Sequence, residues 1–185
     1  MKRQFNQSGR SMVEMLGVLA IIGVLSVGGI AGYSKAMDKY RTQKALDQLT
    51  ILINNIRSLP NLNGLDSSSF NTELAIRLGI VPTEMLNGKS PTTATKAYNV
   101  FNREIDIAMG DFEFGIDYHV GSLYACTTLA AADWGDGLSY ISINGIGDSF
   151  FREDLPLKAS VAAQHCRMQF EGNDNEGYIG IAFKK

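Results

Sequence analysis

Residues 9–31 read GRSMVEMLGVLAIIGVLSVGGIA, and the interpretation of the whole chain starts from this stretch. Within it, residues 12–31 form an apolar run of 20 residues whose only charge is Glu14. At about 1.5 Å per residue, a helix of that length spans roughly 30 Å, the thickness of the hydrocarbon core of a bilayer. The run therefore predicts a membrane-spanning helix near the N-terminus.

The polar residues before the apolar run indicate how the N-terminus is processed. An ordinary secretory signal places its apolar stretch before a small-residue cleavage site. Here Ser8 and Gly9 precede the apolar stretch instead. Cleavage after Gly9 would remove residues 1–9 as a short polar leader and leave the hydrophobic helix on the mature chain. An uncleaved signal anchor, in which Gly9 has no role, is the alternative interpretation.

Glu14 lies where a carboxylate is costly. Moving such a group into a bilayer costs on the order of a few kcal/mol, and less near the interface. Cleavage after Gly9 would create a charged α-amine on Arg10, four residues before Glu14. That spacing is about one helical turn, so the amine of the same chain or of a neighbour could neutralise the carboxylate. In the alternative interpretation, Glu14 lies near the headgroups and extends to water.

The segment from Gly9 to Glu14, followed by an apolar helix, resembles the type IV prepilin signature. The resemblance implies that a dedicated aspartic prepilin peptidase cuts after Gly9 and methylates the new amine of Arg10. It also implies that Glu14, fifth in the mature chain, governs methylation and docking into a growing filament. Two positions depart from the pattern, since many members have Phe, Met or Leu at the position of Arg10 and Pro at the position of Ala31.

Three glycines cluster where many members of that family carry the helix-kinking proline: Gly28, Gly29 and Gly32. Each glycine weakens a helix by about 1 kcal/mol relative to alanine. We expect the helix to bend or melt locally at these glycines during filament packing. Gly28 and Gly32 also have the spacing that lets two membrane helices approach closely, and this second interpretation stays open.

The pattern becomes amphipathic over residues 33–59. Apolar side chains recur there at helical spacings, with charges of alternating sign on the remaining surface. No sustained heptad supports a coiled coil, and Pro60 ends the pattern. One helix is therefore predicted over residues 11–58, with residues 10–32 in a membrane or filament core. The expected apolar stripe consists of Tyr33, Met37, Tyr40, Ala45, Leu49, Leu52, Ile56 and Leu59.

Residues 60–185 predict an α+β globular head, an antiparallel sheet packed on the long helix. Short helices are expected at residues 71–78, 122–132 and 157–168, and strands at 104–108, 112–120, 139–144 and 178–183. The second strand is expected to be half-buried, because a set of apolar residues in it alternates with polar or small ones. That set is Phe112, Phe114, Ile116, Tyr118 and Val120.

Cys126 and Cys166 are the only cysteines, 40 residues apart. An even number of cysteines in a chain with an export anchor favours a disulfide, and two buried free thiols are the alternative. Because a disulfide needs an oxidising compartment, it would place the head outside the cytoplasm and the leader inside.

Three segments of the head, at 79–85, 141–145 and 159–166, resemble the type IVb pilins and the thin-pilus pilins of conjugative plasmids. This resemblance implies the type IV pilin fold. It also implies that the cysteine-bounded region, residues 126–166, is the variable surface of the filament.

The sequence carries no recognisable catalytic or ligand-binding motif. His119 and His165 lack ligand-like spacing, and a bridged Cys166 could not serve as a nucleophile. The loops at 133–137 and 173–176 are oxygen-rich, but solvated turns are expected there rather than Ca²⁺ sites. Trp134 is interpreted either as a subunit contact or adhesive patch, or as a core residue. We expect no enzyme activity, no cofactor and no metal site.

Together these observations predict a pilus subunit of a Gram-negative bacterium. The resemblance implies an inner-membrane prepilin with a periplasmic C-terminal domain, which later becomes an extracellular filament. The expected partners are further copies of the chain, the prepilin peptidase, the inner-membrane assembly machinery and the lipid bilayer. The formal net charge of −2 predicts no nucleic-acid partner. A type II secretion pseudopilin is the first alternative, and a membrane-tethered enzyme or sensor is the second. Adhesion, aggregation, motility and conjugation are all compatible roles.

Overall fold

The computed structural model describes residues 12–185 except for 61, 67, 89, 144–147 and 173–176. The chain forms two compact units, Met1–Met37 and Asp38–Lys185. Helix α1, Met12–Arg57, begins in the first unit and ends in the second. Residues 58–185 of the second unit, called the head below, carry all the described strands and the helices after α1.

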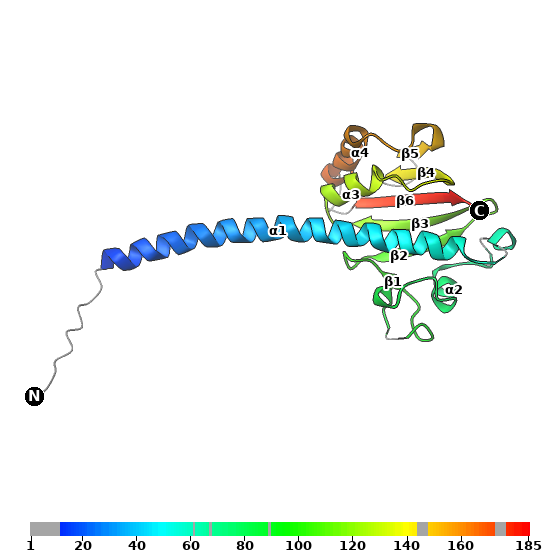
Figure 1. The fold of residues 1–185 in the computed structure, drawn as a ribbon, viewed down its shortest axis with the longest axis horizontal. Helices are drawn as coiled ribbons and strands as arrows, with labels where there is room; N and C mark the ends of the chain where they lie inside the picture. Colours follow the sequence, from blue (N-terminus) through cyan, green and yellow to red (C-terminus); the bar gives the residue numbers. More distant parts are fainter. Residues whose placement is uncertain (1–11, 61, 67, 89, 144–147, 173–176) are drawn as a thin grey trace, which may run out of the picture. The chain divides into compact units, whose positions relative to one another are not determined.

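The head is built on a six-stranded antiparallel sheet with the strand order β1-β2-β3-β6-β4-β5 (Figure 1). The fold is therefore α+β, a long N-terminal helix followed by an antiparallel sheet with short helices. The strands are β1 (Ala97–Tyr98), β2 (Glu104–Met109), β3 (Glu113–Val120), β4 (Leu138–Ile143), β5 (Asp148–Phe151) and β6 (Gly177–Lys184). The helices after α1 are α2 (Thr72–Arg77), α3 (Leu123–Ala130) and α4 (Ala159–Gly172), with 3₁₀ turns at Leu62–Gly64, Thr83–Met85 and Arg152–Asp154.

The core lies between one face of the sheet and the second half of α1. Register pairs Phe114 with Phe183 and Ile116 with Ile181, so these side chains project from the same face. The α1 residues that are buried against the core recur every three or four positions, as one face of a helix requires. They are Ala45, Leu49, Leu52, Ile53 and Ile56.

One polar side chain is enclosed in this helix-to-sheet contact. Gln48 is 4% exposed, and its side-chain oxygen accepts hydrogen bonds from the Tyr118 hydroxyl at 2.8 Å and from the Val100 N–H at 3.1 Å. Burial raises the pKa of Tyr118, which keeps that hydroxyl protonated as a donor. Since a buried polar group left without a partner costs about 1–3 kcal/mol, these bonds fix α1 in one position along the sheet.

Further polar contacts join α1 to the head over its second half. Near the beginning of that half, the Ser122 hydroxyl, which caps α3, donates to the Asp38 carboxylate at 2.7 Å. At its end, Arg57 donates to the carbonyl of Asp136 and lies 4.7 Å from the centre of the Phe183 ring. The contact between α1 and the head therefore extends over about five helical turns.

The predicted elements are confirmed, with boundaries that differ by a few residues. Helix α2 is capped at both ends, since the Asn71 side chain accepts the Leu74 N–H at 2.9 Å and Gly79, just after the helix, has a positive φ of 73°. Strands β1 and β5 were not predicted. Residue 11 at the start of the predicted long helix and Asn144 at the end of a predicted strand lie outside the described residues.

Two expectations about buried side chains are wrong. Tyr33 and Tyr40 were placed on the apolar stripe, but their side chains are 65% and 62% exposed. Phe112 was placed in the half-buried strand, but it precedes β3 and is 84% exposed. In each case the spacing of apolar residues continues beyond the point where the core ends, and periodicity alone does not reveal that end.

We predict that Gln48→Ala lowers the free energy of unfolding by about 3 kcal/mol, because it leaves the Tyr118 hydroxyl and the Val100 N–H without their acceptor. Urea unfolding of the full chain in detergent micelles, followed by fluorescence of the single, buried Trp134, measures this. Gln43→Ala is the matched control, since that exposed side chain donates a weak hydrogen bond to Asp47, at 3.4 Å, and its loss should change stability by less than about 0.5 kcal/mol. Equal effects of the two substitutions would contradict the role of Gln48.

Candidate functional site

The first unit presents an apolar surface that no part of the described chain covers. From residue 12 to residue 33 its large apolar side chains are all more than half exposed, from 53% for Ile22 to 84% for Met12. Such a continuous apolar surface on a soluble protein marks contact with a membrane or with another protein. Among the described residues, one helix is long and apolar enough to cross a membrane, and it is α1. This segment of α1 could therefore serve as an anchor.

Glu14 lies in the first turn of α1 and is the only charged residue from the start of the helix to Lys35. A carboxylate at a helix N-terminus interacts favourably with the helix dipole, by about 0.3–1 kcal/mol. That is less than the cost of placing it in lipid, so a further partner is needed inside a membrane or a bundle. Gly9 and Arg10, the predicted cleavage site and methylated residue, lie outside the described residues, and their roles stay predictions.

No close packing in the described part of the chain requires the glycines of the apolar segment. A Cβ atom added at Gly28, Gly29 or Gly32 would meet no described atom within 4 Å beyond its chain neighbours and the nearby helix backbone, and the same holds for Gly17 and Gly23. All five lie within the assigned helix, although each lowers helix stability by about 1 kcal/mol. These glycines therefore favour either bending of the helix or the close approach of a second helix. The structure describes the unassembled chain, so the bend expected in the filament stays a prediction.

Cys126 and Cys166 form a disulfide, as predicted, with their Cα atoms 5.9 Å apart. The bridge joins α3 to α4, and both cysteines are fully buried. Trp134, which follows α3, is a core residue that is 9% exposed and donates to the Leu129 carbonyl at 3.1 Å. The cysteine-bounded region thus contributes a firmly packed part of the head, and Trp134 is not a surface contact.

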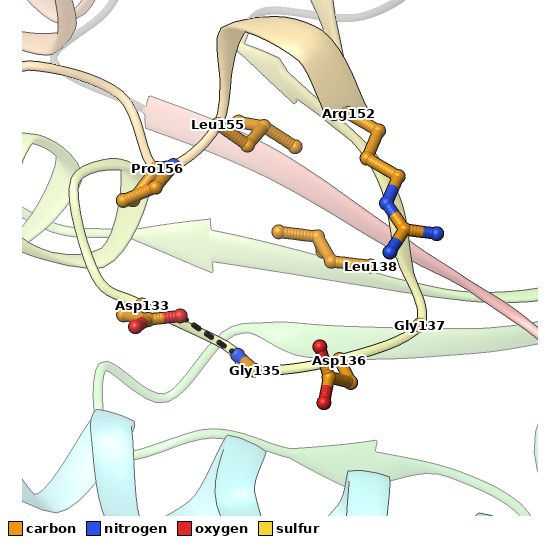
Figure 2. Close-up of a pocket in the computed structure, with 8 residues that line it drawn as sticks. All are labelled: Asp133, Gly135, Asp136, Gly137, Leu138, Arg152, Leu155 and Pro156. Atoms are coloured by element: carbon orange, nitrogen blue, oxygen red, sulfur yellow. Dashed lines mark hydrogen bonds between the residues drawn. The ribbon is translucent and has the colours of Figure 1, made fainter.

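An open pocket of about 390 Å³ is lined by residues of this same region. Figure 2 shows Asp133 and Asp136 on one loop and Arg152 on the facing segment, with Leu138 and Leu155 between them. The Asp133 carboxylate accepts the Gly135 N–H at 3.0 Å, which makes a local turn of the kind that was expected here. In the described part of the chain, no three acidic, histidine or cysteine side chains gather closely enough to hold a metal ion.

The two histidines lie on different elements and share no site. His119 of β3 packs edge-on against Tyr178 at 5.3 Å, and His165 of α4 packs edge-on against Phe150 at 4.8 Å. Next to His119 on the sheet, burial raises the pKa of the Asp117 carboxyl, although the Tyr178 hydroxyl donates a hydrogen bond to it. Cys166, the sequence neighbour of His165, is bridged and cannot act as a nucleophile.

No family model matches this chain, and a search of the curated proteins found no match. The resemblance to pilins therefore depends on the N-terminal motif and on the layout of the fold. A long, apolar N-terminal helix on an antiparallel sheet is compatible with a pilin-like fold.

Several contacts that shape the head were not identified from sequence. Gln48 interrupts an apolar helical face, and this interruption is the signal that could have identified it as a buried hydrogen-bonding residue. The contacts of Asp38 with Ser122 and of Lys44 with Glu84 join residues 84 and 40 positions apart. Nothing in the local sequence pattern indicates such partners.

Replacing both Cys126 and Cys166 by alanine should lower the free energy of unfolding by about 4 kcal/mol, the loop-closure value for a 40-residue separation. Urea unfolding of the full chain in detergent, with and without reductant, measures the change. The wild-type chain kept reduced throughout is the control, and it should match the variant because it lacks the same constraint. A variant with the stability of the oxidised wild type would show that the bridge does not stabilise the head.

Proposed function

We propose that this chain is the structural subunit of a type IV pilus-like filament. In this proposal it is held in the inner membrane with its head in the periplasm, is cleaved after Gly9, and polymerises through the first half of α1. Its partners are then the bilayer, the prepilin peptidase, the assembly machinery and further copies of itself. The chain is a building element of the filament and has no enzyme activity.

The observation that carries the proposal is the uncovered apolar surface of residues 12–33 on the helix that also supports the head. An anchor alone requires only a surface compatible with lipid. This segment also has a carboxylate in its first turn and five glycines that no contact within the chain requires. Small residues allow close helix packing, and a buried carboxylate requires a partner, so both features suit a bundle of helices.

The contacts between the second half of α1 and the head also support the proposal. It is joined to the sheet by a buried apolar face, by the Gln48 hydrogen bonds and by Arg57 at its end. Force applied to the helix would therefore be transmitted to the head through packed contacts. A filament whose core is made of helices and whose surface is made of heads requires such a connection.

The mass of the mature N-terminus tests the proposal most directly. Chains purified from the native host should lack residues 1–9 and carry a methyl group on the amine of Arg10. Intact-mass and fragment-ion spectrometry would detect both changes. A chain that still begins at Met1 would overturn the proposal and leave an uncleaved signal anchor. Electron microscopy of sheared cell surfaces then separates long filaments from the short structure expected of a pseudopilin.

Glu14→Ala should leave membrane insertion intact and abolish filament formation, because the substitution removes a charge that is useful only when an amine neutralises it. Ser26→Ala is the matched control in the same helix, since the Ser26 hydroxyl donates to the Ile22 carbonyl of its own helix at 2.7 Å. Fractionation of membranes measures insertion, and immunoblots of sheared filaments measure assembly. Normal filament yield from Glu14→Ala would rule out the pairing of Glu14 with an amine.

A further inference from the structure

The face of the sheet that points away from α1 carries a row of small and polar residues. Ile116 and Ile181 pair on the core face, so the next pair along the two strands, Asp117 and Gly180, projects from the opposite face. The row in register with this pair, called the outer row below, crosses five strands. From β2 to β5 it consists of Asp106, Asp117, Gly180, Ser142 and Ser149.

Three oxygen atoms of this face converge above Gly180. A Cβ atom added there would lie 2.5 Å from the Ser142 hydroxyl oxygen, 3.2 Å from a carboxylate oxygen of Asp117 and 3.6 Å from the Tyr178 hydroxyl oxygen. The three side chains come from β4, β3 and β6, so the sheet itself holds them together. Glycine is required at this position, because the methyl group of an alanine would already displace the Ser142 hydroxyl.

The Ser142 hydroxyl lies in this group without a partner of its own. Ser142 is 6% exposed, and its hydroxyl forms no hydrogen bond with any residue that the structure describes. A hydroxyl withdrawn from water without a partner is destabilising, so a partner from outside the chain would relieve that cost. Because the hydroxyl and the Asp117 carboxylate approach the same point above Gly180, that point is where such a partner is expected.

The outer row also brings two carboxylates together, since Asp106 and Asp117 lie opposite each other in β2 and β3. Like charges in such positions destabilise a sheet. The described ion pairs include neither carboxylate. Burial raises the pKa of Asp117 and the Asp106 charge raises it further, against the hydrogen bond from Tyr178 and the charge of His119, which lower it. Both acids therefore lack a lysine or arginine partner in the described part of the chain.

The other carboxylates on the strands of this face have basic partners. Glu104 forms an ion pair with Lys96 at 2.7 Å, and Glu113 lies opposite Lys184 in register. His119 is the only other basic side chain on the described strands of this face. With every charge of these strands counted, an excess of negative charge remains at the outer row.

Aromatic rings lie on both sides of the outer row. Register places Tyr178 in the next row on one side and Tyr140 in the next row on the other. The Tyr140 ring packs against Phe151, with ring centres 6.0 Å apart, and Phe151 is 57% exposed. Burial raises the pKa of both tyrosine hydroxyls, and the charge of Asp117 raises it further, as expected for rings near that carboxylate. Rings in these positions can contact the methylene groups or the positive charge of a bound molecule.

These groups define the chemistry of a ligand. Carboxylates only accept hydrogen bonds, and the Tyr178 hydroxyl already donates to Asp117, so the row offers acceptors and negative charge. A metal ion is a poor match, because no third acidic, histidine or cysteine side chain gathers here among the described residues. A primary ammonium group carries three N–H donors, no acceptor and one positive charge. Its three donors match the acceptors of Asp106, Asp117 and Ser142.

We propose that the outer row is a binding site for a primary ammonium group, in which Asp106 and Asp117 supply the negative charge and Ser142 accepts one N–H. The alkyl chain of the ligand then lies on the Tyr140 ring. The same ammonium chemistry is available from a lysine side chain of another copy and from a free alkylamine. The inference concerns a surface that the proposed filament function does not use, and it does not depend on assembly.

Titration of the unassembled full chain in detergent micelles with n-butylammonium chloride tests the site. Nuclear magnetic resonance follows the backbone amides of Asp117, Ser142 and Gly180 at about pH 8, where ordinary histidines are neutral and primary ammonium groups are charged. The three resonances should shift together and saturate. Sodium chloride at the same ionic strength should leave them almost unchanged, because it screens charge but has no N–H donors.

Three substitutions identify the contacts. Asp117→Asn should weaken binding by about tenfold or more, because hydrogen bonds to charged groups are the strong ones. Ser142→Ala should weaken binding severalfold but leave the stability of the unliganded chain to urea unchanged, because its hydroxyl has no described partner to lose. Glu113→Gln is the matched control on the same strand and face. It lies about 13 Å along β3 from Asp117 and should change the affinity by less than about twofold.

A water-soluble carbodiimide, which joins carboxylates to adjacent amines, distinguishes the two sources of the ammonium group. If a lysine of another copy occupies the site, concentrated chains should give linked dimers that disappear in the double variant Asp106→Asn with Asp117→Asn. If the source is a free alkylamine, the double variant and the wild type should give the same products.

Three results of the titration would overturn the inference. The first is an equal shift with sodium chloride, which would show only screening. The second is equally tight binding of tetramethylammonium, which has no N–H donor. The third is a shift of the same resonances by calcium chloride at lower concentration than by n-butylammonium, which would show a metal site. None of these results concerns filament formation, so each would leave the proposed function standing.

Discussion

Between Ala45 and Ile56, α1 buries one face on the sheet, and the Gln48 amide is enclosed within that contact. Apolar surface by itself resists displacement weakly, since a helix that slides by a turn can exchange one set of apolar neighbours for another. An enclosed amide is different, because its partners, Tyr118 and Val100, are each available at one place. A displacement of about 5.4 Å, one helical turn, would separate all three groups and leave them buried without partners. The other contacts of α1 with the head, from Asp38 to Arg57, depend on this position.

The first half of the same helix has no such contact to fix its position. Its side chains are apolar on all sides, so lipid and a bundle of like helices are almost equally good surroundings for it. Transfer from one to the other changes little apolar exposure, and the free energy must come from close packing and from polar groups. Glycines and Glu14 are the residues of this segment that distinguish a protein neighbour from a lipid tail. Each is unfavourable for an isolated helix, by about 1 kcal/mol for a glycine and a few kcal/mol for a carboxylate in lipid.

Local patterns were sufficient to predict most of the fold. The apolar run gave the first half of α1, the spacing of Ala45, Leu49 and Leu52 gave the second, and alternation gave β3. Strands β1 and β5 were missed because Ala97–Tyr98 is two residues long and Asp148–Phe151 is too short to show a period. Tyr40 and Phe112 were assigned to the core because periodicity shows which side chains share a face but does not show where the opposing surface ends. The contacts of Gln48 and Glu84 depend on residues far away in sequence and become visible only when the sheet has assembled.

Tyr40 and Phe112, which were wrongly assigned to the core, have side chains that are exposed on the surface. A segment that is apolar on all sides offers a neighbour many rotational settings of similar burial, so a bundle of such helices does not by itself select one arrangement. Choosing one arrangement then requires contacts that form in only one orientation. Such contacts come from side chains that depart from the apolar pattern or extend beyond the core. In the proposed filament Glu14 would supply one such contact within the apolar segment, where a charge can be neutralised only at defined positions. The Gln48 hydrogen bonds fix the head at one position along the helix, so the position of each helix in a bundle also sets the position of its head. A polymer built on a non-directional helix would therefore take its register from Glu14 and from contacts between heads.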